Sequence, residues 1–226
     1  MEIFDQDLIQ KLKKEQVKLS KKLKIKDKIP VEEINIVAGV DVTFTDIWKN
    51  PTIGIACITV LDIRRFETLE TVYAEETVDF PYIPTFLAYR ELPVILKAYK
   101  KLKTKPDAFI IDGMGIIHPR KMGIASHFGV ITDTVSIGCG KSKLTGEFEQ
   151  PENRKFAYKP VYVDGELRGY VLRTKKNANP VFVSPGNNIS IESSLKVVIR
   201  SVKDYKLPEP TRLAHLNLQR YRKKLI

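Results

Sequence analysis

Three β-strand patterns with only short connections between them lie early in the chain, and they constrain the fold more than any other feature. β-Branched residues mark a buried strand over about Ile34–Phe44, and two more strand patterns follow over about Ile53–Leu61 and Glu67–Thr77. Because the connections are too short for a crossover helix, we expect these three strands to form an antiparallel meander.

Helix and strand patterns alternate in the segments that follow. A helix over about Thr85–Leu102, which Pro93 should kink, leads into the apolar segment 106–112, and this crossover makes that strand parallel to an earlier one. We then expect a short helix at Lys121–Phe128 and a strand at Thr134–Gly138. The order predicts an α/β fold with a ribonuclease H-like mixed sheet, in which three antiparallel strands are followed by parallel strands and helices flank the sheet.

A basic helix is predicted at the start of the chain, over about residues 5–28. Leu12, Gln16 and Leu19 fall at helical spacing there, among nine lysines. Those lysines form either a solvated face of a packing helix or direct contacts to phosphates.

The second half of the chain contains one irregular insertion and two further helices. Residues 145–180 are expected to form a peripheral hairpin, and segment 182–186 leads into a helix over about Ile191–Val202. The last helix begins near Pro210. Since no repeat, low-complexity tract or long linker divides the sequence, residues 1–226 are expected to form one domain.

The charge of the chain points towards a polyanionic partner. It contains 38 Lys and Arg against 27 Asp and Glu, a formal net charge of +11. Nucleic acid is the commonest polyanion that such a protein meets, and the alternative is a basic protein that binds none.

The first residues and the cysteines indicate a cytoplasmic protein. The segment MEIFDQDLIQ carries acids and lacks the pattern of a signal peptide, and no apolar run approaches the ~20 residues that span a bilayer. We therefore expect no membrane association. Cys57 and Cys139 each lie within an apolar run, so we expect no disulfide, which suits a reducing compartment.

Two aspartates stand where the apolar character of a strand ends. Asp41 follows Val37–Val40 and Asp112 follows Phe109–Ile111. A charge in an apolar strand is unfavourable unless it is paired or binds a metal, and hard oxygen ligands favour Mg²⁺, with Mn²⁺ as a substitute. In the alternative interpretation, each aspartate merely ends its strand or caps a turn.

Other polar and aromatic residues are weaker candidates taken alone. Glu91 shares a helix with residues that can face the sheet, although a surface position is the ordinary one for glutamate. Gly113 and Gly115 allow a flat group such as a base to approach the backbone. Tyr82, between two prolines, either packs in the core or forms a rigid wedge for a base stack.

Longer motifs make the sequence resemble the endonuclease V family, in the family's order and over about four fifths of the chain. The matching segments are VAGVDVTF (37–44), FPYIPTFLAYRELP (80–93), IDGMGIIHPRKMGIASHFGV (111–130), IGCGKSKL (137–144), FVSPGN (182–187) and PEPTRLAH (208–215).

The resemblance implies a metal-dependent endonuclease with a ribonuclease H-like fold, which acts in DNA repair. It implies recognition of inosine (hypoxanthine) or another deaminated purine in DNA and hydrolysis of the second phosphodiester bond 3′ to the lesion, leaving 3′-hydroxyl and 5′-phosphate ends. We expect a monomer. Two alternatives stay open: an endoribonuclease specific for inosine in single-stranded RNA, and a non-catalytic nucleic-acid-binding module on the same fold.

The resemblance also implies roles for individual residues. Asp41 and Asp112 match the metal ligands, and Tyr82 matches the wedge. Three positions depart from the usual pattern: Thr85 replaces a glycine, Met114 a more polar residue, and Cys139-Gly140 a Val-Ala pair. The implied catalytic residues are Asp41, Glu91, Asp112, Lys141 and His215, and the implied lesion-binding residues are Tyr82, Thr85, Leu87, Gly113, Gly115, His118, Ile124 and Leu144.

Overall fold

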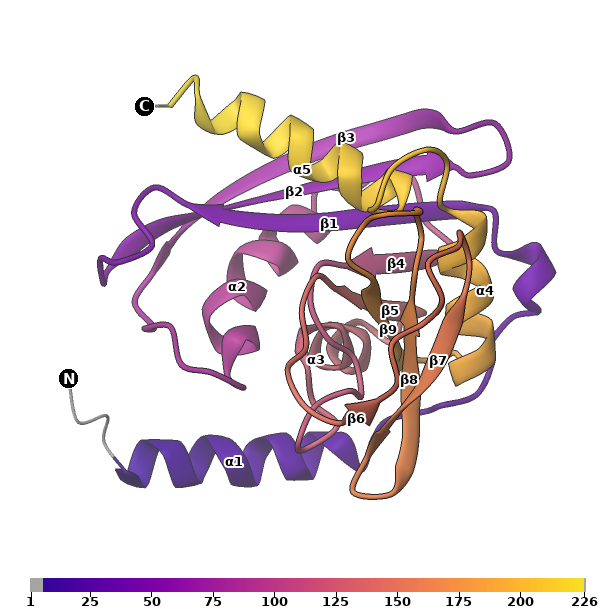
Figure 1. Ribbon diagram of the computed structural model, residues 1–226. Coiled ribbons are helices and arrows are strands. Elements are labelled where there is room, and N and C mark those ends of the chain that lie inside the picture. Colours follow the sequence, from indigo (N-terminus) through magenta and orange to yellow (C-terminus); the bar gives the residue numbers. More distant parts are fainter. Residues whose placement is uncertain (1–5, 226) are drawn as a thin grey trace.

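One mixed β-sheet runs through the molecule. The computed structural model describes residues 6–225, and within them nine strands lie in the order β3-β2-β1-β4-β5-β9-β8-β7-β6 across the sheet (Figure 1). The strands are β1 (Ile36–Phe44), β2 (Thr52–Asp62), β3 (Glu67–Val78), β4 (Ala108–Ile111), β5 (Ser136–Gly140), β6 (Glu147–Phe148), β7 (Tyr158–Val163), β8 (Glu166–Leu172) and β9 (Val181–Asn187).

The antiparallel meander predicted from the sequence forms one side of this sheet. Strand β1 pairs with β2 from Ile36 opposite Asp62 to Phe44 opposite Gly54, and β2 pairs in turn with β3. Strand β2 lies between two partners, and its apolar residues are buried on both faces because helices pack on each side of the sheet. The prediction of three antiparallel strands is confirmed.

The parallel part of the sheet places the end of β4 beside the middle of β1. Strand β4 lies between β1 and β5 and is parallel to both, and all four of its residues are buried. Val40 of β1 is opposite Ile111 of β4. The residues that follow these two, Asp41 within β1 and Asp112 just after β4, therefore lie side by side.

Helices cover both faces of the sheet (Figure 1). Helices α2 and α3 pack on one face, where Val40 and Phe109 belong to their core cluster. Helices α4 and α5 lie on the other face, and α1 packs through Leu12 against Ile83 and Phe86. The helices are α1 (Gln6–Ser20), the short 3₁₀ helix η1 (Val31–Glu33), α2 (Leu87–Tyr99), α3 (Ile124–Thr132), α4 (Ile191–Arg200) and α5 (Glu209–Arg222).

Some predicted helix boundaries are wrong. Helix α1 ends at Ser20 instead of continuing to about residue 28, and residue 5 lies outside the described residues. Helix α3 begins at Ile124 rather than at Lys121, whose φ of 56° is left-handed and cannot start a helix. Helix α2 continues through Pro93.

The segment 182–186, predicted only to lead into a helix, forms most of strand β9. This strand pairs antiparallel with both β5 and β8. The predicted hairpin within residues 145–180 is present as β7 and β8, and β9 joins it to the main sheet.

Two smaller observations bear on the sequence predictions. Cys57 and Cys139 are both free thiols and both buried. Among the described residues, none of the helices combines the length and the apolar character needed to cross a bilayer.

Candidate active site

Two carboxylates from neighbouring parallel strands open into one cavity. Asp41, inside β1, has only 6% of its surface exposed, and Asp112 directly follows β4. Both line a cavity of about 410 Å³ between the sheet edge and the start of α2. The pairing of β1 with β4 brings the two residues together although 71 positions separate them in the sequence.

His215 of helix α5 holds the Asp41 carboxylate. Its Nδ1 lies 2.8 Å from Asp41 Oδ2. Gly39 explains this placement, because a Cβ atom there would lie 2.0 Å from the carbonyl carbon of Pro210. The first turn of α5 thus packs directly against the backbone of β1. The helix rises about 6 Å over the four residues that lead to His215, and the strand rises about 6.6 Å over the two residues from Gly39 to Asp41. Because these two distances are similar, a helix that contacts the backbone at Gly39 brings His215 beside Asp41.

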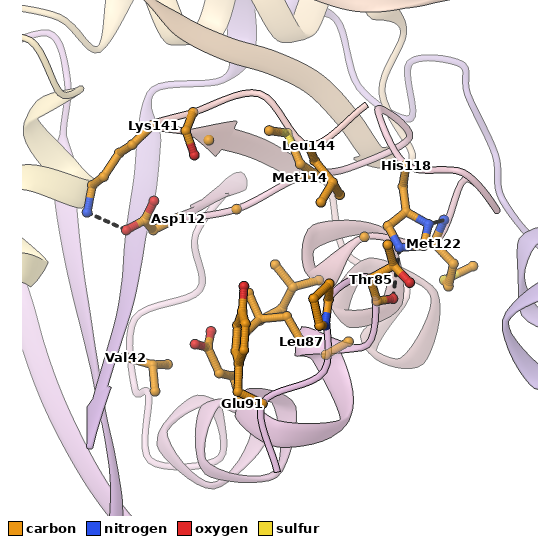
Figure 2. A pocket seen from close by; sticks show the side chains of 18 of the residues that line it. Val42, Thr85, Leu87, Glu91, Asp112, Met114, His118, Met122, Lys141 and Leu144 are labelled. Carbon is orange, nitrogen blue, oxygen red and sulfur yellow. Dashed lines mark hydrogen bonds and ion pairs between the residues drawn. The ribbon is translucent and has the colours of Figure 1, made fainter. Parts of the chain in front are cut away.

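Lys141 forms an ion pair with Asp112, the second aspartate of the cavity. It follows β5, and its Nζ lies 2.5 Å from Asp112 Oδ2 (Figure 2). Burial acts to lower the pKa of Lys141, but the negative charges of Asp112 and Asp41 outweigh that effect and the pKa is raised. Lys141 is therefore a stable cation inside the cavity.

Glu91 adds a third carboxyl group from helix α2, on the side of the cavity away from Asp112 and Lys141 (Figure 2). Desolvation and the neighbouring charges of Asp112 and Asp41 raise the pKa of Glu91 well above its ordinary value. Desolvation also raises the pKa of Asp41 to about 6, with a further contribution from Asp112. The negative charges that help to raise the pKa of Glu91 and of Asp41 also attract a cation.

Apolar side chains form the opposite part of the cavity. Leu87, Ile124 and Leu144 line it, together with Met114, whose thioether group lies against Gly140 (Figure 2). A Cβ atom at Gly140 would lie 2.6 Å from Met114 Cε, so Gly140 makes room for this methionine. An aromatic group can enter this region without losing hydrogen bonds to water.

His118 is built into the cavity wall. It is 2% exposed, and its Nδ1 accepts from the backbone amides of Arg120 and Met122. Its Nε2 therefore carries the proton and donates to the carbonyl of Thr85 at 2.9 Å (Figure 2). Burial lowers the pKa of His118 to about 4, so the ring is neutral near pH 7.

Most residues that the sequence singled out meet in this cavity. Tyr82 lies at its rim with 62% of its surface exposed. Gly115 is not one of the described residues that line the cavity. It packs against the backbone of Pro185, because a Cβ atom at Gly115 would lie 2.0 Å from the carbonyl oxygen of that residue. The lining residues predicted from the sequence are Asp41, Tyr82, Thr85, Leu87, Glu91, Asp112, Gly113, His118, Ile124, Lys141 and Leu144.

Sequence reasoning missed several residues around the cavity. Met122 and Ser142 line it, and Gln16 and Arg120 lie behind its wall. The signal for Gln16 was present, because it is a polar residue at an apolar position of the first helix. Its partners could not be identified, since they lie far away in the sequence.

The donor set at this site fits a hard divalent cation. Within residues 6–225, no group of three or more His, Cys, Asp and Glu side chains is arranged to hold a metal ion. Mg²⁺ commonly binds one or two carboxylates and completes its shell with water and substrate phosphate. Asp41 and Asp112 meet that requirement.

Comparisons with known proteins agree on one family. The family model described as Endonuclease V matches residues 17–216. Endonuclease V of Dictyoglomus turgidum is 45% identical over 205 residues, which cover 91% of this chain and 87% of the relative.

Solved structures share the fold. Endonuclease V of Bacillus subtilis superposes with a TM-score of 0.88 at 35% identity, covering 97% of this chain and 92% of that one. Ciona intestinalis endonuclease V, in complex with a 24mer DNA containing an inosine followed by a ribo-adenosine, has a TM-score of 0.84 at 24% identity, covering 97% and 100% of the two chains. The predicted ribonuclease H-like fold is confirmed. The chain belongs to the endonuclease V family and is an endonuclease.

Proposed function

We propose that this endonuclease is Mg²⁺-dependent and recognises inosine, or another deaminated purine, in DNA. It would hydrolyse the second phosphodiester bond 3′ to the lesion and leave 3′-hydroxyl and 5′-phosphate ends. One observation carries the proposal: a cluster of carboxylates opens directly into a cavity that has apolar walls and an exposed tyrosine at its rim. The site therefore joins groups suited to a phosphate with space suited to a base.

At the carboxylate end of the cavity, Asp41 and Asp112 would hold the metal ion. A bound Mg²⁺ supplies Lewis-acid activation of the phosphate and lowers the pKa of the attacking water. Lys141, already on Asp112, can direct its ammonium group to a phosphate oxygen and neutralise developing charge. His215 keeps Asp41 in place from α5, and Glu91 orients water from α2.

The other end of the cavity suits a flipped purine. Leu87, Ile124 and Leu144 offer apolar contact to the faces of the base. Main-chain groups near Thr85 and Gly113 can read its polar edge. Tyr82, exposed at the rim, can stack on the bases left in the duplex and fill the gap that the flipped base leaves.

DNA is the substrate that the comparisons favour. The complex of the Ciona intestinalis protein contains inosine in a DNA strand, and that strand also carries a ribonucleotide. Inosine-containing RNA is the competing substrate. We propose that the protein acts as a monomer, which its mass measured by light scattering would test.

Matched oligonucleotides test the proposal. The substrates are single-stranded DNA, duplex DNA and single-stranded RNA, each with either one inosine or an adenosine at the same position. Each substrate is incubated with Mg²⁺, with Mn²⁺ or with a chelator. The position of the cut is then mapped on a sequencing gel. We expect metal-dependent cutting of inosine DNA at the second bond 3′ to the lesion. Equal cutting of the adenosine strand contradicts lesion recognition, and cutting of the RNA alone favours the endoribonuclease.

A further inference from the structure

Thr85 has an unusual backbone for its position in the cavity wall. Its φ is 69°, in the left-handed region that side chains with a branched Cβ avoid. Helix α2 begins only at Leu87, so Thr85 lies in the turn that brings the chain from Tyr82 into that helix. A residue in such a conformation stays there only when its surroundings fix it.

Both sides of the peptide between Thr85 and Phe86 are fixed by hydrogen bonds. The carbonyl of Thr85 accepts from His118 Nε2 at 2.9 Å and from Gln16 Nε2 at 3.0 Å. The amide of Phe86 donates to the carbonyl of Ile83 at 3.0 Å. The hydroxyl of Thr85 accepts from Arg120 Nη2 at 2.6 Å. This peptide therefore cannot rotate without breaking several bonds.

Gln16 connects the cavity wall at Thr85 to a second wall at Met122. The side chain is fully buried, and its amide nitrogen is also 3.5 Å from the carbonyl of Met122. Its amide oxygen accepts from Arg120 Nε at 2.5 Å. Thr85 and Met122 both line the cavity, whereas Gln16 does not. One side chain from helix α1 therefore spans two walls from behind.

Arg120 is held in turn by an aromatic ring. Its guanidinium carbon lies 4.7 Å from the centre of the Phe86 ring, and Phe86 belongs to the apolar cluster that anchors α1 through Leu12. Leu12 and its apolar neighbours already attach α1 to the protein. A buried amide is unfavourable without partners, and the partners of Gln16 are the two walls and Arg120.

We infer that Gln16 and Arg120 are positioning residues that set the spacing between the two walls of the lesion cavity, and thereby the selectivity for the base. The inference rests on the proposed function, since it assigns a role within the proposed lesion pocket. Neither residue is among the described residues that line the cavity. Loss of the hydrogen bonds that Gln16 and Arg120 make should therefore have a large effect on which base is accepted and a smaller effect on the rate of hydrolysis.

The test compares Gln16→Leu with Gln10→Leu. Both change one glutamine of α1, but Gln10 is exposed. For each protein, kcat and KM are measured on inosine and guanosine strands of the same sequence, with the melting temperature measured in parallel. We expect Gln16→Leu to lower the inosine-to-guanosine ratio of kcat/KM by about tenfold, the scale of one lost hydrogen bond, mainly through KM for inosine. Gln10→Leu should match the wild type.

Each result decides between the possibilities. A lower melting temperature with a selectivity ratio within twofold of wild type would make Gln16 a purely structural residue and overturn the inference. Arg120→Lys, which keeps the charge and removes the forked contacts, gives the same decision if Gln16→Leu does not fold. If the wild type itself shows no preference for inosine, the proposed function fails, and the inference fails with it.

Discussion

Asp41 and Asp112 are the residues on which cutting should depend most. Replacing either with Asn should reduce cleavage at saturating Mg²⁺ by at least about 100-fold, because a neutral amide holds the cation poorly. Asp41→Asn should leave the melting temperature unchanged or raise it, since it removes one negative charge from a buried cluster. Strong residual cleavage in either purified variant would remove that residue from the metal site.

The matched control for these variants is Asp133→Asn. Asp133 is an exposed carboxylate, outside the cavity, that binds Lys24 and Lys28. Its replacement should leave cleavage unchanged. Comparison of the three proteins separates loss of the metal site from a general loss of negative charge.

Tyr82 should contribute to lesion binding and little to stability. An aromatic side chain stacked on a base contributes about 1–3 kcal/mol, so Tyr82→Ala should weaken binding to an inosine duplex by about one to two orders of magnitude. Tyr82 is 62% exposed, which argues against core packing, and the melting temperature should stay close to that of the wild type. Tyr82→Phe keeps the ring and should retain most of the preference. A large fall in melting temperature with unchanged lesion affinity would contradict the wedge.

His127 should make the protein less stable in acid. Burial lowers its pKa from 6.5 to about 4, so between these values the unfolded chain binds a proton that the folded chain does not. The free energy of unfolding therefore falls as the pH drops through this window, by at most about 3 kcal/mol for this group, and His127 adds no pH dependence above it.

His127→Phe tests this pH dependence. Phenylalanine keeps a ring against Tyr89 and removes the titrating group, including a buried Nδ1 that has no hydrogen-bond partner within the described residues. Urea unfolding between pH 7.5 and 4 should show a shallower loss of stability than in the wild type. Parallel curves for the two proteins would mean that His127 is not responsible.

At the level of single residues, the sequence predicted those parts of the site that follow from strand order. Asp41 and Asp112 each follow an apolar run, and the parallel pairing of β1 with β4 brings the ends of these runs together, although β1 itself continues to Phe44. Gln16 was different. Its partner Thr85 lies 69 positions away, and no local pattern shows which carbonyl a buried amide will meet.

Helix α5 is the element whose docking completes the site. Gly39→Ala places a Cβ atom against the backbone of Pro210, so α5 must move away from β1 and carry His215 from Asp41. We expect about 1–3 kcal/mol of destabilisation and a loss of cleavage larger than the loss of folded protein explains.

The control for this variant is Gly54→Ala in β2. There a Cβ atom would meet only side chains, the nearest being a methyl group of Val78 at 3.0 Å. The melting temperature and the cleavage rate of both variants are compared. If Gly39→Ala cuts as fast as Gly54→Ala, the close contact between β1 and α5 does not position His215.

Elements with a regular apolar pattern were predicted well, and those with special backbones were not. The meander and β4 follow from β-branched and apolar runs. Strand β9 contains Pro185 and Gly186, which normally argue against a strand. It is stabilised by pairing with strands on both sides, and this tertiary effect is invisible in a window of seven residues.

For the whole molecule, the net charge of +11 should act on phosphates and not on the choice of base. Affinity for nucleic acid should fall steeply with salt, with a slope of log K against log[salt] of about −0.9 for each phosphate neutralised. Titrations of inosine and undamaged duplexes at several salt concentrations should give parallel lines with a constant offset. A slope near zero would mean that the basic surface serves another partner.

The contact between Gly39 and the start of α5 also joins two segments that are synthesised at different times. Asp41 leaves the ribosome early, but His215 is synthesised 174 residues later. Until then, β1 and β4 can pair and bring their aspartates together while the face that α5 covers stays open. Fragments that end between Asp112 and Pro208 contain both aspartates and lack this histidine. The nuclease site proposed above, which includes His215, can therefore be complete only after most of the described residues have been synthesised.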